Sequence, residues 1–182
     1  MINFQAYYNL ITNNNFMPDG TTQNTSGADF KQSSGTFYNN VLVGNCASNS
    51  KLGSIYVYPD GISNVTIKNN IVMNDRSAKD MDFNQVGESV VSSDFNLVYN
   101  ESRAVNIQIG TTDYTWSAYK TFTKQESHSV NADPRFISIT NSNFKLQSIS
   151  PAINKGISIA GITTDYLGKT LSGLRDIGAY EF

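Results

Sequence analysis

Asn69-Asn70-Ile71-Val72-Met73-Asn74 is one of four copies of a short pattern in which an Asn precedes two or three apolar residues. The other copies are Tyr8-Asn9-Leu10-Ile11-Thr12-Asn13, Asn39-Asn40-Val41-Leu42-Val43 and Phe95-Asn96-Leu97-Val98-Tyr99-Asn100. The leading Asn residues are separated by 31, 30 and 26 residues, and they are Asn9, Asn40, Asn70 and Asn96. A near-constant period in this range is the signature of a solenoid, in which each repeat forms one coil.

The residue types suit the turns and strands of such a coil. Asn tolerates the left-handed backbone region, so it can turn a chain sharply between two strands. When identical turns stack at the spacing of β-strands, their side-chain amides can hydrogen-bond along the stack as a ladder. The Val, Ile and Leu residues that follow suit a short strand facing a solenoid interior. We therefore assign a structural role to the four leading Asn residues.

Composition supports an all-β chain of one domain. The chain has 182 residues, of which 15% are charged and 22 are Asn. Few charges and many turn-forming residues favour short strands, while 39% hydrophobic and 12% aromatic residues disfavour disorder. The net charge of −2 and the lack of a basic cluster disfavour a nucleic-acid partner. No apolar run is long enough for a membrane span, and the single Cys46 rules out an intrachain disulfide and a cysteine-based metal site.

The order of the segments predicts one domain over residues 1–182. Residues 1–110 are expected to form the coils with Asn turns, and residues 111–182 to form C-terminal coils and a cap. The repeat begins at once after Met1, without a polar cap in front of it. Because an open solenoid end exposes unpaired backbone and bare core, we expect the first coil to stack on another chain or on a more N-terminal part of a longer protein.

About the last 70 residues carry a second set of motifs. In chain order these are Trp116, Lys124–Ser129, Asp133-Pro134-Arg135-Phe136, Phe144–Leu146, Ser150–Ile153 with Gly156, Asp165 with Gly168, Arg175 and Asp176–Glu181. Their order resembles the C-terminal end of bacterial right-handed parallel β-helix proteins of the pectate-lyase-like superfamily. The resemblance implies a secreted or cell-surface β-helix, here of about five or six coils with a C-terminal cap. We assign a structural role to the terminal residues Asp165, Arg175 and Asp176, as a charge pair that holds the last coil and satisfies polar groups at an exposed end.

The superfamily includes polysaccharide lyases, glycoside hydrolases and epimerases, so the resemblance leaves the activity open. Its lyases use a basic side chain to abstract the C5 proton of a uronate, with Ca²⁺ neutralising the sugar carboxylate. By resemblance, Arg76 or Lys79 would supply that base, and a nearby cation would lower the pKa of a lysine towards a useful value. The alternative is that both residues belong to an ordinary charged loop.

Oxygen-bearing residues alternate in the same region, at Asp80, Asp82 and Asn84. In a strand these three side chains share one face, and grouped oxygen ligands suit Ca²⁺. The alternative is a solvated loop in which these side chains point outward while Met81 and Phe83 pack inward.

Tyr56 and Tyr58 alternate with Ile55 and Val57. If the aliphatic residues face inward, the two tyrosines form an outward aromatic strip that can stack on sugar rings. The opposite register buries them. The only histidine, His128, lies within the cap motif, where a hydrogen-bonding loop residue is the simpler interpretation.

A glycoside hydrolase would need two carboxylates across the scissile bond. Such candidates lie near the repeat turns without a preferred pair, and they are Asp60, Asp75, Asp94 and Glu101. The leading expectation is therefore an extracellular, carbohydrate-interacting β-helix, as part of a polysaccharide-active protein that binds Ca²⁺ if it acts as a lyase. The alternative is a non-catalytic assembly module that stacks through its N-terminal coil.

Overall fold

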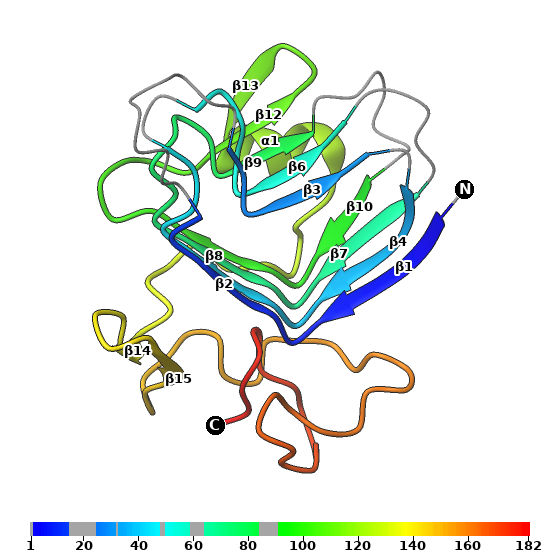
Figure 1. Ribbon diagram of the computed structural model, residues 1–182, viewed down its shortest axis with the longest axis vertical. Coiled ribbons are helices and arrows are strands. Elements are labelled where there is room, and N and C mark those ends of the chain that lie inside the picture. Colours follow the sequence, from blue (N-terminus) through cyan, green and yellow to red (C-terminus); the bar gives the residue numbers. More distant parts are fainter. Residues whose placement is uncertain (1, 15–24, 32, 48–49, 59–63, 84–90) are drawn as a thin grey trace.

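The chain folds into a parallel β-solenoid, which confirms the expected all-β class. The computed structural model describes residues 2–14, 25–31, 33–47, 50–58, 64–83 and 91–182. Each coil contributes one strand to each of three sheets, so neighbouring strands of a sheet come from successive coils. The three sheets form three sides of the stack (Figure 1).

Each sheet contains four parallel strands from the solenoid. The first sheet consists of β1 (Ile2–Tyr7), β4 (Ser33–Tyr38), β7 (Val65–Lys68) and β10 (Val91–Asp94). The second consists of β2 (Leu10–Thr12), β5 (Val41–Val43), β8 (Ile71–Met73) and β11 (Leu97–Tyr99). The third consists of β3 (Ala28–Phe30), β6 (Ile55–Val57), β9 (Met81–Phe83) and β12 (Asn106–Ile109), to which β13 (Thr112–Thr115) adds an antiparallel strand.

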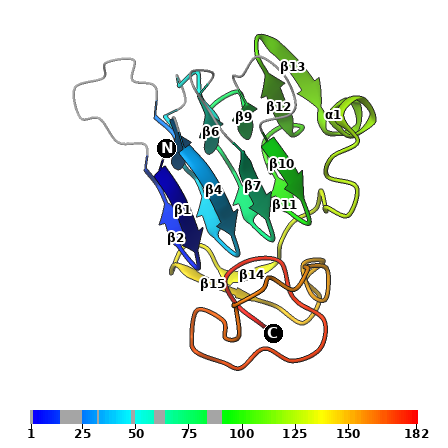
Figure 2. The same ribbon diagram turned by 90° about the vertical axis from the view of Figure 1, so that its right-hand side faces the viewer.

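The described residues form four coils, fewer than the five or six expected from the sequence. The coil path ends because β13 turns back on β12, after which the chain forms the helix α1 (Trp116–Thr123). The later strands β14 (Phe136–Ser138) and β15 (Asn143–Leu146) form a separate antiparallel hairpin. Residues after 131 therefore lie beside the stack, where coils had been expected (Figures 1 and 2).

The Asn ladder is confirmed, and it runs through the turn between the first and second sheets. The amide Nδ2 of Asn9 donates to Oδ1 of Asn40 at 2.8 Å, and Nδ2 of Asn40 donates to Oδ1 of Asn70 at 2.9 Å. Asn70 continues the row to Oδ1 of Asn96 at 3.1 Å. At each step, the backbone N–H of the donor residue bonds to the same oxygen. The last three ladder residues are fully buried.

The left-handed backbone lies one residue earlier than we expected. The ladder residues themselves avoid positive φ, and the residues just before them adopt it, namely Tyr8, Asn39, Asn69 and Phe95 with φ between 56° and 59°. A ladder residue must aim its amide along the stack. The residue before it therefore adopts the left-handed conformation that reverses the chain, and in two coils this residue is a second Asn.

The strands of the second sheet are buried on both faces. Leu42, Val72 and Val98 point into the solenoid core, whereas their neighbours point outward into a second apolar cluster. That cluster contains residues of the C-terminal segment, among them Phe136, Phe144, Leu146 and Ile177. Burial on both faces explains why these strands read as continuous apolar runs.

Hydrogen bonds fasten the C-terminal segment to the stack. Asn69 donates from Nδ2 to the Ile157 carbonyl at 2.7 Å and accepts from the Ile157 N–H at 2.9 Å. The Gly178 N–H bonds to the Asn69 carbonyl at 2.8 Å. Asn69, a buried residue next to the ladder, thus binds two segments that are remote in sequence, at Ile157 and at Gly178.

The end of the stack beyond β10, β11 and β12 is covered by the segment that follows them. Tyr119 of α1 is fully buried against Phe83, with ring centroids 6.2 Å apart. The ladder ends at Glu126, whose carboxylate accepts from Asn96 Nδ2 at 3.2 Å and from the hydroxyls of Ser93 and Ser129. Burial raises the pKa of Glu126, and these hydrogen bonds oppose the rise. Within the described part of the chain, the structure has no helix with the length and apolar character needed to cross a bilayer.

Candidate functional site

The outer face of the third sheet carries a row of polar and aromatic side chains. Asp29, Tyr56, Asp82 and Gln108 are paired in register on successive strands. Their strand neighbours point inward, because alternate residues of a strand face opposite sides of a sheet. Beside this row lies a cavity of about 340 Å³, here called the outer-face pocket, lined by Lys51, Leu52, Tyr56, Lys79, Asp82, Gln108, Gly110 and Thr111.

Lys79 is held firmly in the outer-face pocket. Its Nζ donates to the Lys51 carbonyl at 2.5 Å, to Asp82 Oδ2 at 3.1 Å and to Gln108 Oε1 at 2.5 Å. These bonds use all three protons of the ammonium group. In this arrangement Lys79 presents no lone pair to a substrate, and it acts as a support for Asp82 and Gln108.

Asp82 provides an acceptor without a partner. Its side chain is 1% exposed, and Oδ1 is buried without a hydrogen bond from any described residue, while Oδ2 accepts from Lys79. Burial raises the pKa of Asp82, and the bond and charge of Lys79 oppose this rise. A buried oxygen with no donor is costly. A ligand hydroxyl in the pocket would remove that cost.

The two tyrosines follow the outward register, but they do not form an open strip. Ile55 and Val57 face the core, so Tyr56 points to the outer face, where it is nevertheless only 5% exposed. The rings of Tyr56 and Tyr58 meet edge to face, with centroids 4.3 Å apart, and Lys31 lies 5.1 Å above the Tyr58 ring. Tyr56 therefore forms part of a pocket wall.

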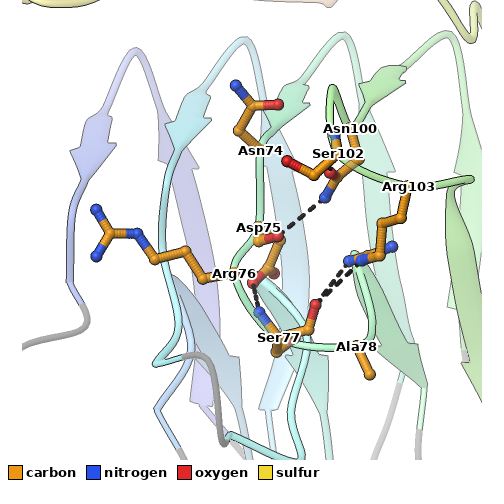
Figure 3. Close-up of a pocket in the computed structure, with 8 residues that line it drawn as sticks. All are labelled: Asn74, Asp75, Arg76, Ser77, Ala78, Asn100, Ser102 and Arg103. Carbon is orange, nitrogen blue, oxygen red and sulfur yellow. Dashed lines mark hydrogen bonds between the residues drawn. The ribbon is translucent and has the colours of Figure 1, made fainter.

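A second cavity, the turn pocket, lies between the second and third sheets (Figure 3). Its volume is about 520 Å³, and its lining residues are Asn74, Asp75, Arg76, Ser77, Ala78, Asn100, Ser102 and Arg103. They come from the segment between β8 and β9 and from the turn after β11. The two pockets flank residues 77–79, since Ser77 and Ala78 line one and Lys79 lines the other.

Asp80 and Arg103 form an ion pair next to the turn pocket. Arg103 Nη1 lies 2.7 Å from Asp80 Oδ2, and Nη2 lies 3.2 Å from Oδ1. Arg103 also donates to the Ser77 carbonyl, and Asp80, fully buried, accepts from the N–H of Asn106. This arrangement braces the loop from residue 77 to residue 80 against the next coil.

The predicted calcium ligands therefore have different partners. Asp80 binds Arg103 and Asp82 binds Lys79, while Asn84 lies outside the described residues. Among the residues that the structure describes, no group of three or more His, Cys, Asp or Glu side chains is arranged to hold a metal ion.

Arg76 and Lys79 are not brought together. Arg76 is exposed and points away from the buried side of the turn pocket, whereas Lys79 lines the outer-face pocket (Figure 3). Among the described residues, Arg76 has no carboxylate within ion-pair distance. Within the described part of the chain, it is a cation without an ion pair that lines a polar cavity.

The carboxylates considered for hydrolysis are also dispersed. Asp75 lines the turn pocket, whereas Glu101 lines a different cavity beside the β14–β15 hairpin. Asp94 pairs with His128, and Asp60 lies outside the described residues. Asp75 and Glu101, the two of these candidates that line cavities, therefore line different ones.

His128 is a hydrogen-bonding loop residue. Its Nδ1 lies 2.7 Å from Asp94 Oδ2 and 3.1 Å from the Ser127 hydroxyl, and its ring stacks on Phe95. A relay from serine through histidine to a carboxylate needs both ring nitrogens, but here both partners share one. Burial alone would raise the pKa of Asp94, but hydrogen bonds from the His128 side chain and N–H lower it.

Asp165 and Arg175 have separate partners. Asp165 accepts from the N–H groups of Leu167 and Lys169, at 2.9 and 2.8 Å, and from the N–H of Glu181 at 3.2 Å. Arg175 donates to the Gly173 carbonyl. The described residues show no ion pair between Asp165 and Arg175, so backbone N–H groups hold this carboxylate.

Asp75 is a buried carboxyl group with an unusual ionisation. Burial raises its pKa from 3.8 to about 6, against hydrogen bonds from the Ser77 N–H and the Cys46 thiol. Because the folded pKa lies above the unfolded one, protonation of Asp75 favours the fold below about pH 4, and this contribution is lost as the pH rises through about 6. A rise of this size corresponds to about 3 kcal/mol.

The Asp75→Asn variant should therefore gain stability relative to the unmodified protein as the pH rises. Between pH 4 and pH 7 the difference in unfolding free energy is expected to shift in its favour by up to about 3 kcal/mol. Urea unfolding at both pH values measures this shift, with the exposed Asp113 as the site of a matched Asp→Asn control. A difference that does not depend on pH would contradict the expectation.

Part of this site was missed in the sequence. Gln108 belongs to the alternating stretch Val105–Ile109, which indicates a strand and no site. Arg103 carries no signal, because its partner Asp80 lies 23 residues earlier. Searches against protein-family models, curated protein sequences and solved structures found no match for this chain.

Proposed function

We propose that this chain is an extracellular carbohydrate-binding β-solenoid whose outer-face pocket holds one sugar unit of a polysaccharide. The observation that carries the proposal is that Asp82 lines a cavity of about 340 Å³ and has a buried Oδ1 that lacks a donor among the described residues. A sugar hydroxyl is a donor of the right size and polarity. The resemblance of the C-terminal motifs to secreted β-helix proteins supports the location and the class of ligand.

The other groups of the pocket suit a sugar ring. Gln108 and Thr111 supply polar side chains, and Tyr56 supplies part of an aromatic wall. Few, well-oriented polar groups beside an apolar or aromatic surface are typical of small-molecule sites. Lys79 fixes Asp82 and Gln108 before a ligand arrives, which lowers the entropic cost of binding.

The neighbouring turn pocket favours an acidic polymer. A polysaccharide that leaves the outer-face pocket across residues 77–79 would reach Arg76, a cation without a carboxylate partner among the described residues. A guanidinium group binds a uronate carboxylate through paired hydrogen bonds. We therefore propose a uronic-acid polymer as the ligand, with binding as the function.

Affinity electrophoresis and calorimetry with alginate, pectate and chondroitin test this proposal. The Asp82→Asn variant places a donor amide where the carboxylate accepts, so it is expected to weaken binding at least tenfold, or about 1.4 kcal/mol. Asp133→Asn, which changes a carboxylate outside both pockets, should bind as the unmodified protein does. Thermal unfolding must show that both variants are folded.

The same samples decide whether catalysis accompanies binding. Elimination would produce unsaturated sugar ends with ultraviolet absorbance, and it would require Lys79 to leave its three acceptors or Arg76 to act as the base. A rise in absorbance, with or without Ca²⁺, would show a lyase. Failure of the folded protein to bind any of the three polymers would refute the proposed function.

A further inference from the structure

The two ends of the solenoid differ in how their backbone groups are paired. At one end, β1, β2 and β3 are the outermost strands of their sheets (Figure 2). At the other end, each sheet has a further partner: the Glu126 N–H bonds to the Ser93 carbonyl, Val130 bonds to Val98, and β13 pairs with β12. No described residue pairs with the outer edges of β1, β2 and β3. Three open edges thus lie side by side at one end.

The ladder is open at the same end and has a direction. Each ladder oxygen accepts from the N–H and Nδ2 of the Asn one coil earlier, as Asn40 Oδ1 does from Asn9. Asn9 Oδ1 accepts from no described residue. It therefore offers the acceptor that another coil, running in the same direction and carrying an Asn at its turn, would use.

The apolar residues at this end are incompletely covered. Ala6, Ile11 and Ala28 are half-buried, although they point into the solenoid core. Their register partners one coil further on are almost completely buried, namely Phe37, Leu42 and Ile55. One added coil would bury the first set as the second set is buried.

We propose that the end formed by β1, β2 and β3 is an interaction surface for a parallel strand–Asn–strand segment of a partner polypeptide. A second copy joined head to tail does not fit, because the opposite end is covered by α1, Gln125–Val130 and β13. Two copies joined head to head would set the Asn9 oxygens of both ladders against each other without donors. A parallel segment satisfies the three edges, the ladder and the core at once.

A peptide derived from the chain itself provides the probe. The peptide Asn64–Asn74 contains strand, Asn turn and strand, and an Asn70→Ala version serves as its control. Titrated into the ¹⁵N-labelled protein, the first peptide is expected to shift the amide signals of β1 and β2 and to leave those of β12 and β13 unchanged. The Asn70→Ala peptide is expected to bind at least tenfold more weakly, because it lacks the side-chain donor for Asn9 and keeps only the backbone N–H.

Two protein variants complete the experiment. Ile11→Lys places a charge on the apolar end, and Asn9→Ala removes the ladder acceptor with little disturbance of the fold, so each should weaken peptide binding at least tenfold. Absence of shifts at millimolar peptide, or equal binding of both peptides, would overturn the proposal. So would a dimer in sedimentation that Ile11→Lys dissociates, because the surface would then be occupied by a second copy.

Discussion

The Asn70→Ala variant is expected to lose roughly 3–5 kcal/mol of unfolding free energy. Asn70 is fully buried, its Nδ2 donates to the Phe37 carbonyl at 2.9 Å, and its Oδ1 accepts from the N–H of Asn40 at 3.0 Å. Alanine leaves both backbone groups buried without a partner, at about 1–3 kcal/mol each, and adds a cavity. Urea unfolding followed by circular dichroism measures the loss.

Asn9→Ala is the matched control, because Asn9 occupies the equivalent turn in the outermost coil, at the open end. Its amide is exposed to solvent, which can replace the bonds to Tyr7 and Asn40. We expect a loss of less than about 1 kcal/mol. Equal losses in the two variants would show that the interior of the ladder contributes no more than its exposed end.

The Arg103→Ala variant is expected to lose about 3–5 kcal/mol of unfolding free energy, measured by urea unfolding. Asp80 is fully buried, and its two carboxylate oxygens lie 2.7 and 3.2 Å from the guanidinium nitrogens of Arg103. Removing Arg103 leaves the buried carboxylate with the Asn106 N–H and Asn100 Nδ2 as donors but without a counter-charge, which is costlier than losing an exposed ion pair. The Ser77 carbonyl loses its donor as well.

Arg76→Ala provides the control for Arg103→Ala, since both residues line the turn pocket and carry the same charge. Arg76 is exposed and has no carboxylate partner among the described residues, so its removal should change the unfolding free energy by less than about 0.5 kcal/mol. In the double variant Asp80→Asn/Arg103→Ala, part of the lost stability should return, because the buried charge is gone. A loss that stays the same or grows would contradict this explanation.

The solenoid and its ladder could be predicted because the residues that form them recur in the sequence at a nearly constant spacing. Each coil meets only its neighbours, so an Asn every 26 to 31 residues specifies both the turn and the contact between turns. The outward register of Tyr56 followed for the same reason, from alternation with Ile55 and Val57. Local patterns that repeat also determine which residues become neighbours in space.

The remaining features depend on contacts between residues that are far apart in the sequence, and a repeat period does not predict such contacts. Asn69 binds Ile157 across 88 positions, and this contact places the C-terminal segment on the outer face of the second sheet. The uninterrupted apolar runs of β5 and β8 indicate strands that are covered on both faces, because a strand with one solvated face would alternate apolar and polar residues. The number of coils was overestimated because this segment was counted as part of the stack.

The partners of the charged residues could not be predicted from the sequence either. Asp80 and Asp82 share a sequence pattern with calcium ligands, but Arg103 and Lys79 bind them in the folded chain. Which cation reaches a carboxylate depends on the path of the next coil. Sequence alone could therefore suggest the oxygen groups, but not what neutralises them.

The ladder that ends at Glu126 also gives the stack an electrical polarity. The bonds between its side-chain amides all run in one direction, from Asn9 towards Asn96, so their dipoles add and these bonds strengthen one another. The second Nδ2 proton of Asn40, Asn70 and Asn96 goes to a backbone carbonyl of the preceding coil. The positive end of this row meets the carboxylate of Glu126, much as the N-terminus of a helix meets an anion. The negative end is Oδ1 of Asn9, which accepts from no described residue. The field of the whole row therefore attracts donor groups to the open end of the stack and repels acceptors from it.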